Sequence, residues 1–168
     1  MRNIEISKLS TAYHVRELTV DDVDMIHTFC AGNTQYYEYC GKECSMELIE
    51  NDLVTLPPGI FMEQKYYVGF FERSKLVAVM DLIDGYPDAR TAYIGFFMMS
   101  RELQGQGIGS KIISEVFYYL HQLGFTHCRL GIDRDNPQSN HFWRKNSFQV
   151  IREVSLEEGV ILVAEKQL

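Results

Sequence analysis

Two absences limit what this chain can do. None of its 168 residues belongs to an apolar run as long as a membrane-spanning helix, so we expect no membrane partner. Basic residues are also outnumbered by acidic ones. The net charge is −7, which argues against general nucleic-acid binding because such binding requires a basic face. The acidic balance is compatible with a cationic substrate such as an amine, but acidity also serves solubility alone.

Cysteine is scarce and scattered. The four cysteines are Cys30, Cys40, Cys44 and Cys128. Cys40 and Cys44 are four residues apart, which suits one helix face, but no second pair at matching spacing completes a zinc site. We therefore expect free thiols and no bound metal. Residues 1–7 lack the apolar core of a signal peptide, so a cytoplasmic protein is expected.

No repeat, low-complexity segment or linker divides the chain, and its length predicts one domain over residues 1–168. Apolar, β-branched runs predict strands, and capping residues before periodic apolar positions predict helices. The predicted strands cover residues 13–18, 65–71, 76–83, 92–99, 125–132, 149–154 and 160–166. The predicted helices follow Thr19, cover 33–39, run from Ser45 to before Pro57, cover 110–120 and follow Asn136.

The most informative segment is a glycine-rich loop between the predicted strand 92–99 and the predicted helix 110–120. Its sequence is Gln104-Gly105-Gln106-Gly107-Ile108-Gly109. Glycine lets the backbone approach a ligand closely, and the first amides of a helix have no intrahelical acceptors. Such a loop suits a bound pyrophosphate without help from a lysine.

The spacing of these glycines separates the loop from two common phosphate-binding motifs. A Walker A loop ends in Gly-Lys-Ser/Thr, whereas Gly109 is followed by Ser110 and Lys111. A dinucleotide fingerprint, G-x-G-x-x-G, differs in spacing and lies near the start of a βαβ unit, which disfavours a nucleotide-binding oxidoreductase. The form Q-x-x-G-x-G between an apolar strand and an apolar helix resembles the acetyl-CoA loop of the GNAT N-acetyltransferase superfamily.

A second segment strengthens the resemblance. Residues 135–148 run Asp-Asn-Pro-Gln-Ser-Asn-His-Phe-Trp-Arg-Lys-Asn-Ser-Phe. This is similar to the second GNAT signature, which has an Asn-led turn, a helix with an aromatic pair, a lysine and then Gly-Phe. The resemblance covers residues 92–148. It implies an α/β fold with a GNAT-like mixed, mostly antiparallel sheet flanked by helices in a single domain.

The resemblance also implies which residues would bind acetyl-CoA. The loop amides and the Ser110 hydroxyl would face the pyrophosphate, and the strand before the loop would pair with the pantetheine arm. The implied cofactor-binding residues are Phe97, Met98, Met99, Gln104, Gly105, Gln106, Gly107, Ile108, Gly109, Ser110, Asn136, Ser139 and Trp143. Asn136 has a structural explanation as well, because Asn-Pro-x-Ser is a good helix start. Lys145 is placed either near the nucleotide or in solvent.

Three positions depart from the family pattern. Trp143 stands where many members have the tyrosine that protonates the leaving thiolate, and an indole is not a general acid near neutral pH. Residues 91–93, Thr-Ala-Tyr, stand where members often place a glutamate that acts as a base through water. Ser147 replaces the usual glycine before Phe148. The residues that bind the cofactor in the family therefore match this chain well, whereas the residues that act as acid and base match it poorly.

One carboxylate lies inside an apolar strand. Asp81 interrupts the run 76–83, and burying a carboxylate is costly unless it is paired or faces a cavity. Burial would raise its pKa toward the range of a general base, so Asp81 is the candidate catalytic residue. A structural hydrogen bond or an exposed sheet face is the alternative. Tyr36, Tyr37 and Tyr39 either stack on a cationic amine or pack in the core.

The resemblance implies an acyltransferase that moves an acetyl group from acetyl-CoA to a primary amine by direct attack in a ternary complex. The acceptor would be a small-molecule amine or a protein amine, and the resemblance also allows a homodimer. The alternative is a non-catalytic acyl-CoA-binding sensor or regulatory module.

Overall fold

A seven-stranded sheet organises the protein, whose computed structural model describes residues 2–168. The strand order is β1-β2-β3-β4-β5-β7-β6. Only β4 and β5 pair in parallel, and every other neighbouring pair is antiparallel. The strands are β1 (His14–Glu17), β2 (Lys65–Glu72), β3 (Lys75–Asp84), β4 (Thr91–Met99), β5 (His127–Asp133), β6 (Gln149–Leu156) and β7 (Gly159–Gln167). The predicted mixed, mostly antiparallel α/β sheet is confirmed.

Five α-helices flank the sheet, and side-chain caps mark where several helical segments begin. Thr19 and Asp22 form a capping box before the first helix. Ser45 accepts the Leu48 N–H at 3.1 Å, and Asn136 caps the last helix. The helices are α1 (Val23–Ala31), α2 (Thr34–Cys40), α3 (Met46–Val54), α4 (Ile108–Gln122) and α5 (Pro137–Lys145). None of the helices in residues 2–168 combines the length and apolar character needed to cross a membrane.

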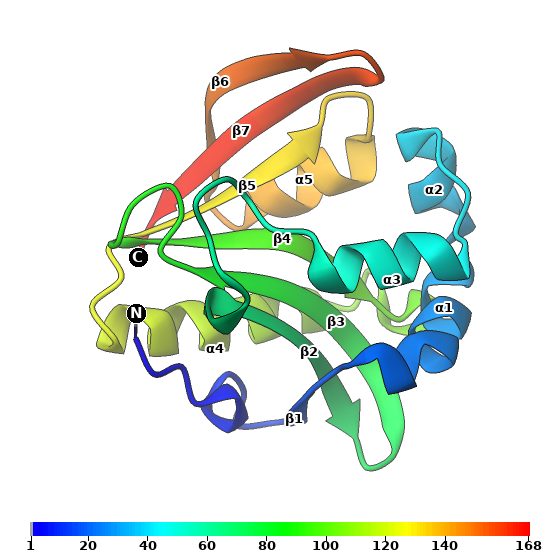
Figure 1. Cartoon of the computed structure of the whole chain (residues 1–168), viewed down its shortest axis with the longest axis horizontal. Helices are drawn as coiled ribbons and strands as arrows, with labels where there is room; N and C mark the ends of the chain where they lie inside the picture. Colours follow the sequence, from blue (N-terminus) through cyan, green and yellow to red (C-terminus); the bar gives the residue numbers. More distant parts are fainter. Residues whose placement is uncertain (1) are drawn as a thin grey trace.

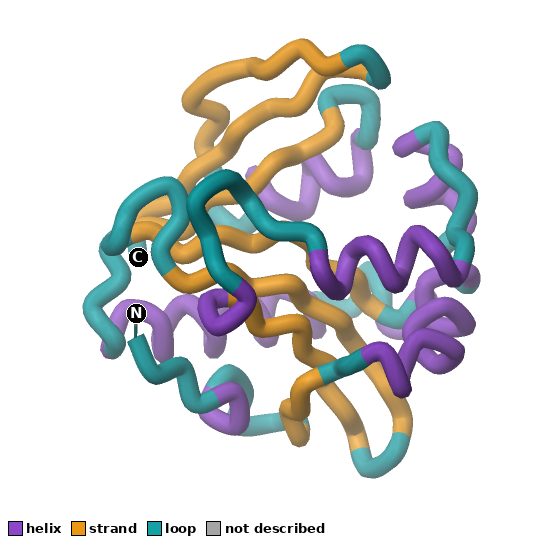
Figure 2. The backbone as a smooth tube through the Cα atoms, viewed as in Figure 1, coloured by secondary structure: helices purple, strands orange, loops and turns teal. Residues whose placement is uncertain are grey.

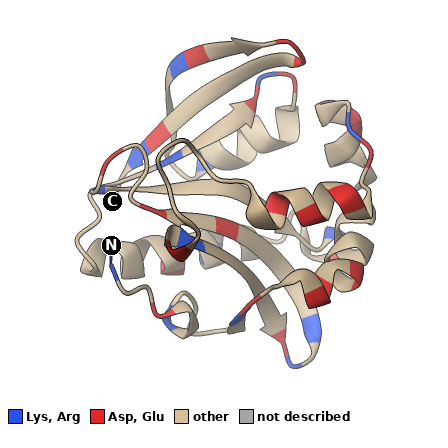
Figure 3. Ribbon diagram, in the orientation of Figure 1, with Lys and Arg blue, Asp and Glu red and all other residues tan. Residues whose placement is uncertain are grey.

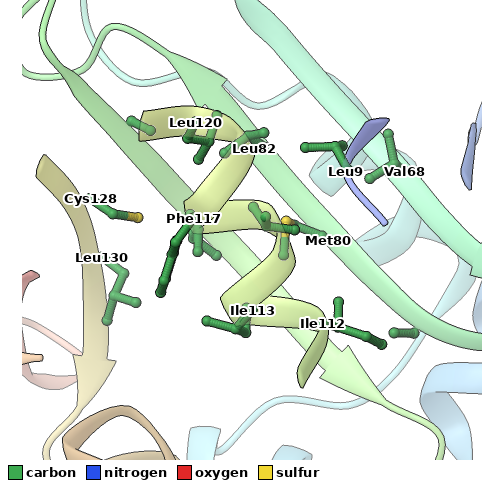
Figure 4. Packing of buried hydrophobic residues seen from close by; sticks show 14 of the residues in the cluster. Leu9, Val68, Met80, Leu82, Ile112, Ile113, Phe117, Leu120, Cys128 and Leu130 are labelled. Carbon is green, nitrogen blue, oxygen red and sulfur yellow. The ribbon is translucent and has the colours of Figure 1, made fainter. Parts of the chain in front are cut away.

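Helices cover both faces of the sheet (Figures 1 and 2), and the buried residues form a separate core on each face. On one face, α4 buries Ile113, Phe117 and Leu120 against Met80 and Leu82 of β3 (Figure 4). On the other face, α1, α2 and α3 pack over β2 and β3. The residues of this second core include Ile26, Tyr37, Ile49, Leu53, Tyr67 and Val79. From Ala78 to Met80, consecutive side chains of β3 therefore belong to different cores.

The sheet opens between β4 and β5. A register shift between Asp81 and Leu82 leaves Gly95 of β4 without a partner in β3, which makes a β-bulge. The pairing of β4 with β5 covers only Thr91–Ile94. Beyond this point the two strands diverge (Figure 1). The bulge and the end of pairing fall together, so the two strands separate in the middle of the sheet.

The predicted start of the strand after α4 was wrong. The strand predicted to start at residue 125 starts at His127, because the chain is still closing the end of α4 at Phe125. Gly124 has φ +83°, and the Phe125 N–H donates to the Leu120 carbonyl at 3.1 Å. This satisfies a carbonyl that the end of the helix would leave free.

Shortening Leu120 should weaken the fold. Its side chain is fully buried between α4 and the sheet, whereas Tyr118 on the same helix is 69% exposed. Leu120→Ala should lower the free energy of unfolding by about 2–5 kcal/mol, since it removes buried methyl groups and leaves a cavity. Tyr118→Ala is the control and should change it by less than about 0.5 kcal/mol. Urea denaturation measures both, and equal effects would contradict this packing.

Candidate functional site

The glycine-rich loop enters α4 through two left-handed residues. Gly105 has φ +75° and Gly107 has φ +78°, a conformation that residues with a Cβ rarely adopt. Gly107 is the N-cap of α4, and no side chain caps the helix there. A Cβ at either glycine would meet no other atom within 4 Å, so backbone conformation, not lack of space, selects glycine at both positions.

The loop presents a run of free backbone donors. The first backbone hydrogen bond of α4 joins the Lys111 N–H to the Gly107 carbonyl at 3.2 Å. Across residues 2–168, no backbone acceptor receives an N–H from Gly105 through Ser110. These donors lie at the positive end of a 15-residue helix. The arrangement can hold an anion such as a pyrophosphate without a basic side chain.

A cavity of about 370 Å³ lies beside this loop. The open half of β4, the loop, α5 and the start of α2 enclose it. Its lining includes the predicted residues Phe97, Met98, Met99, Gln104, Gly105, Gly107, Gly109, Ser110, Asn136, Ser139 and Trp143. It also includes Asn33, Tyr36, Leu103, Gln138, His141, Phe142 and Lys145. The structure therefore brings most of the two sequence motifs to one site.

Two predicted loop residues and Asp81 do not line this cavity. The exposed Gln106 side chain donates to the Glu102 carbonyl at 2.8 Å, outside the cleft. Ile108 packs against the core beneath α4. The backbone N–H groups of both loop residues nevertheless belong to the free donor run, so any contact with a ligand would be made through the backbone.

Gly109 allows the helix to approach β4 and α5. A Cβ there would lie 3.1 Å from Met99 Cγ and 3.2 Å from Phe142 Cε2. Both distances are tighter than ordinary van der Waals contact, so a larger residue would displace the wall of the cavity. Gly109 thus serves packing, in contrast to Gly105 and Gly107.

Gln104, the first residue of the motif, uses its side chain as a cross-link. Its Nε2 donates to the Asn33 Oδ1 at 2.5 Å and to the Met99 carbonyl at 3.1 Å. Its Oε1 accepts from Gln138 Nε2 at 2.9 Å. One amide therefore joins the start of α2, the end of β4 and α5. The sequence did not identify Asn33 and Gln138 as site residues, because only the folded chain brings them into contact with Gln104.

The backbone of β4 has an open edge along the cavity. The Ser100 N–H donates to the Val77 carbonyl of β3 at 2.9 Å. Backbone groups alternate sides along a strand, so Met98 is also directed at β3, and Phe97 and Met99 are directed away from it. The Met99 carbonyl accepts from Gln104, which agrees with this alternation. The open edge can pair with an extended ligand as another strand would.

The family model for the acetyltransferase (GNAT) family matches residues 26–148, which is most of the chain and includes the loop and α5. The chain belongs to the GNAT family.

Solved structures of acetyltransferases share this fold. An acetyltransferase from Thermus thermophilus is 20% identical, with a TM-score of 0.76 and 100% of both chains covered. An acetyltransferase from Salmonella typhimurium, which modifies the N-terminal serine of a 50S ribosomal subunit protein, is 18% identical, with a TM-score of 0.71 and coverage of 95% and 97%. An aminoglycoside acetyltransferase in complex with coenzyme A is 13% identical, with a TM-score of 0.69 and coverage of 91% and 93%. No curated protein matches the chain in sequence.

In this GNAT domain, Trp143 belongs to an aromatic wall. It is buried, and its ring lies 4.9 Å from Phe142, 5.1 Å from Phe148 and 6.0 Å from Phe97 between centroids. Ser147, which replaces the usual GNAT glycine, has φ +71°. The position keeps the left-handed turn that glycine would make, and the Phe148 N–H closes the helix by donating to the Trp143 carbonyl at 3.0 Å.

Asn136 performs its structural role in the GNAT fold. Its Oδ1 accepts the Ser139 N–H at 2.9 Å, which caps α5. The residue is 2% exposed and lines the cavity. The cap is therefore present, and contact between Asn136 and a ligand stays a prediction.

The tyrosine cluster divides between the cavity and the core. Tyr36 lines the GNAT cleft and meets Phe96 edge to face, with 5.7 Å between ring centroids. Tyr37 is buried in the core under α1 and α3. Tyr39 lies outside the lining and accepts from Gln35 at 3.1 Å. Only Tyr36 is placed to contact a ligand in the cleft.

Asp81 lies on the sheet face beneath α1–α3 and is ion-paired. The Lys65 Nζ is 2.7 Å from its Oδ2. Burial raises the pKa of Asp81, and the nearby Lys65 opposes this rise. Its Oδ1 is buried and has no hydrogen-bond partner in the described chain. The structural alternative from the sequence is thus present, and a role as general base stays a prediction.

Acidic residues gather over α1 and α3 (Figure 3). Among them, Asp52 on α3 has a pKa raised to about 6, first by burial and then by repulsion from Asp81. No group of three or more His, Cys, Asp or Glu side chains within residues 2–168 is arranged to hold a metal ion. The cysteines there are free thiols.

Asp52 should make stability depend on pH. Its pKa in the folded protein, about 6, lies above its ordinary value of 3.8, so ionising it disfavours the fold. The favourable contribution of Asp52 to the free energy of unfolding is complete below about pH 4 and is lost as the pH rises through about 6. Asp52→Asn should therefore gain stability relative to wild type between about pH 4.5 and about pH 7.5, measured by denaturant unfolding.

The exposed Glu50→Gln on the same helix is the control for the change in net charge. A constant difference between Asp52→Asn and wild type at every pH would show that the Asp52 carboxylate is not disfavoured by the fold.

Proposed function

We propose that this protein transfers an acetyl group from acetyl-CoA to a primary amine by direct attack in a ternary complex. The observation that carries the proposal is the run of free N–H groups from Gly105 to Ser110 beside a cavity in a GNAT fold. The aminoglycoside acetyltransferase with the same fold was solved with coenzyme A. The donors here suit a pyrophosphate, and the open edge of β4 suits the amide-containing arm that follows it.

Each part of the cleft has a separate task in this proposal. Acetyl-CoA would supply the acetyl group as a thioester. The loop amides would bind the pyrophosphate, and the outward N–H groups of Phe97 and Met99 would be available to polarise the thioester carbonyl. Trp143 would position the ligand through its buried ring without moving a proton. Positioning of this kind supplies a large part of the rate in bimolecular reactions.

The acceptor must lose a proton before it attacks, because amines are mostly protonated at neutral pH. Asp81 would take this proton through water, since it is the carboxylate of β3 next to the bulge of β4. The acceptor would be a small-molecule amine or the amine of a protein. Solved structures of the same fold include an enzyme named for each kind of acceptor.

The first test is binding and turnover. Calorimetry with coenzyme A and a thiol-release assay across a panel of primary amines would establish both halves of the proposal. Tight binding with no transfer to any amine would instead favour an acyl-CoA-binding module, which the absence of the tyrosine acid at Trp143 would then explain.

The glycine loop supplies a sharper prediction. Gly107→Val should force a branched residue into the left-handed N-cap of α4, which would redirect the amides that face the ligand. Loss of one or two amide contacts should lower the affinity for coenzyme A by about 10-fold or more. Calorimetry on folded protein measures this affinity. Gly124→Val is the matched control. Gly124 has φ +83° at the far end of the same helix and no atom within 4 Å of a built Cβ.

Gly124→Val should destabilise the protein through the same backbone strain but keep its affinity for coenzyme A. Equal affinities in the two variants would show that the loop conformation at Gly107 does not matter for binding.

Replacing the Asp81 carboxylate tests its role as base. Asp81→Asn keeps the shape and removes the proton acceptor, so kcat/KM should fall by about 100-fold or more. The acidic limb of the pH profile should disappear, while coenzyme A affinity should stay near that of wild type. Full activity with the original pH profile would return Asp81 to a purely structural role.

A further inference from the structure

A lysine is buried at the start of β2. The Lys65 side chain is 1% exposed, and its Nζ donates to Asp81 Oδ2 at 2.7 Å and to the Thr55 carbonyl at 3.1 Å. The ammonium also lies 5.5 Å from the centroid of the Tyr67 ring. Burying an ammonium is costly, and a hydrophobic replacement is often neutral or stabilising. Stability alone therefore need not be the reason for a lysine at this position.

The carboxylate that Lys65 holds stands beside the bulge of β4. Across the sheet, Asp81 is the direct partner of Tyr67 on β2 and of Phe96 on β4. A Cβ built on Gly95 would lie 2.5 Å from Asp81 Oδ2, and Gly95 itself is exposed. Only a glycine at this position leaves the carboxylate in place next to the opening between β4 and β5.

The ion pair leaves hydrogen-bonding capacity unused. Lys65 occupies Asp81 Oδ2, while Oδ1 has no partner in the part of the chain that the structure describes. The buried Tyr67 hydroxyl is likewise unpaired within those residues. Buried polar atoms are nearly always satisfied, so two unpaired oxygens on adjacent strands indicate a place where a ligand or water completes the network.

We propose that Lys65 is a positioning residue for the reaction: its buried ammonium holds Asp81 in place beside Gly95 as a carboxylate that can take a proton from the acceptor amine. The inference rests on the proposed acetyl transfer with Asp81 as base. Thr55 and Lys65 together would act as a fixed support, and Gly95 as the opening through which the carboxylate meets the acceptor or its water.

The proton balance is simple. The acceptor ammonium gives one proton to Asp81 through water, and its nitrogen forms the bond to the acetyl carbon. The carbon–sulfur bond breaks, and the sulfur leaves with the electron pair. The nitrogen, now bonded to the acetyl carbon, loses its second proton to solvent, and the thiolate takes a proton from solvent. Asp81 then returns its proton to solvent. Lys65 keeps its charge throughout, so it neither gains nor loses a proton in the cycle.

Lys65 should set the pH at which Asp81 becomes a base. Burial raises the Asp81 pKa and Lys65 lowers it. The other titratable groups near Asp81 are Tyr67 on β2, Asp52 on α3 and Tyr93 on β4. None of these three is a cation. Loss of Lys65 would therefore raise the Asp81 pKa further and leave less of the carboxylate ionised at neutral pH.

The test is the pH profile of kcat/KM in Lys65→Met. The acidic limb should move to higher pH by about 1–3 units, the range expected for loss of an adjacent opposite charge, with coenzyme A affinity unchanged. Lys65→Arg should move the limb back toward wild type. In an Asp81→Asn background, Lys65→Met should cause no further loss, because the residue it supports is already gone.

Lys75→Met is the matched control. Lys75 also pairs with a carboxylate, Glu102, at 2.5 Å, but both side chains are exposed. A second readout that needs no turnover is the carboxyl ¹³C titration of Asp81, assigned with Asp81→Asn. If Lys65→Met does not fold, two comparisons still test the proposal. The first compares Lys65→Arg with wild type. The second compares the double variant Lys65→Met/Asp81→Asn, which removes both charges together, with Asp81→Asn.

The outcomes separate two failures. Turnover with an unmoved acidic limb in Lys65→Met, or a further fall in the double variant, would overturn the role of Lys65 and leave acetyl transfer standing. A wild-type protein that binds coenzyme A but acetylates no amine would overturn the proposed function, and the role of Lys65 with it.

Discussion

The end of backbone pairing between β4 and β5 is the constraint on which the rest of the structure depends. Parallel strands exchange hydrogen bonds along their whole shared length, but here the ladder stops at Ile94 because the bulge at Gly95 turns the strand. The strand edge beyond it keeps its donors and acceptors free. The cavity, the approach of the glycine loop and the place of the Asp81 carboxylate beside Gly95 all follow from that single interruption.

The interruption also separates two kinds of chemistry. On the side of α4 and α5, the cleft offers oriented N–H dipoles and aromatic surface, and it suits an anionic ligand with an extended arm. The α1–α3 side of the sheet, outside the cavity lining, carries carboxylates with raised pKa values, which suits a group that must lose a proton. Both sides meet at β4, where consecutive residues face opposite cores.

The sequence predicted the features that depend on neighbours along the chain. The caps at Thr19, Ser45 and Asn136 are visible because a short polar side chain precedes a periodic apolar pattern. The glycine loop is visible because left-handed residues at a helix start are almost always glycine. These local rules place the helices and most of the cavity lining.

What could not be predicted depends on pairing between distant segments. The isolated Asp81 was noticeable, but its partner Lys65 lies on another strand, and register alone brings them together. The contacts of Gln104 with Asn33 and Gln138 join residues 71 and 34 positions apart. The Gly95 bulge has no local signal, since an exposed glycine in a strand also occurs without one.

The glycine loop carries no charged residue, and this has a consequence for how a ligand arrives. Dipoles act only at short range, so the long-range field comes from the whole molecule, whose net charge is −7. An anion that the loop would bind on contact is therefore weakly repelled on approach. Dissolved salt screens that repulsion within about 10 Å at about 0.1 M. Encounter with an anionic ligand should then quicken as ionic strength rises, the reverse of what a protein with a net positive charge would show.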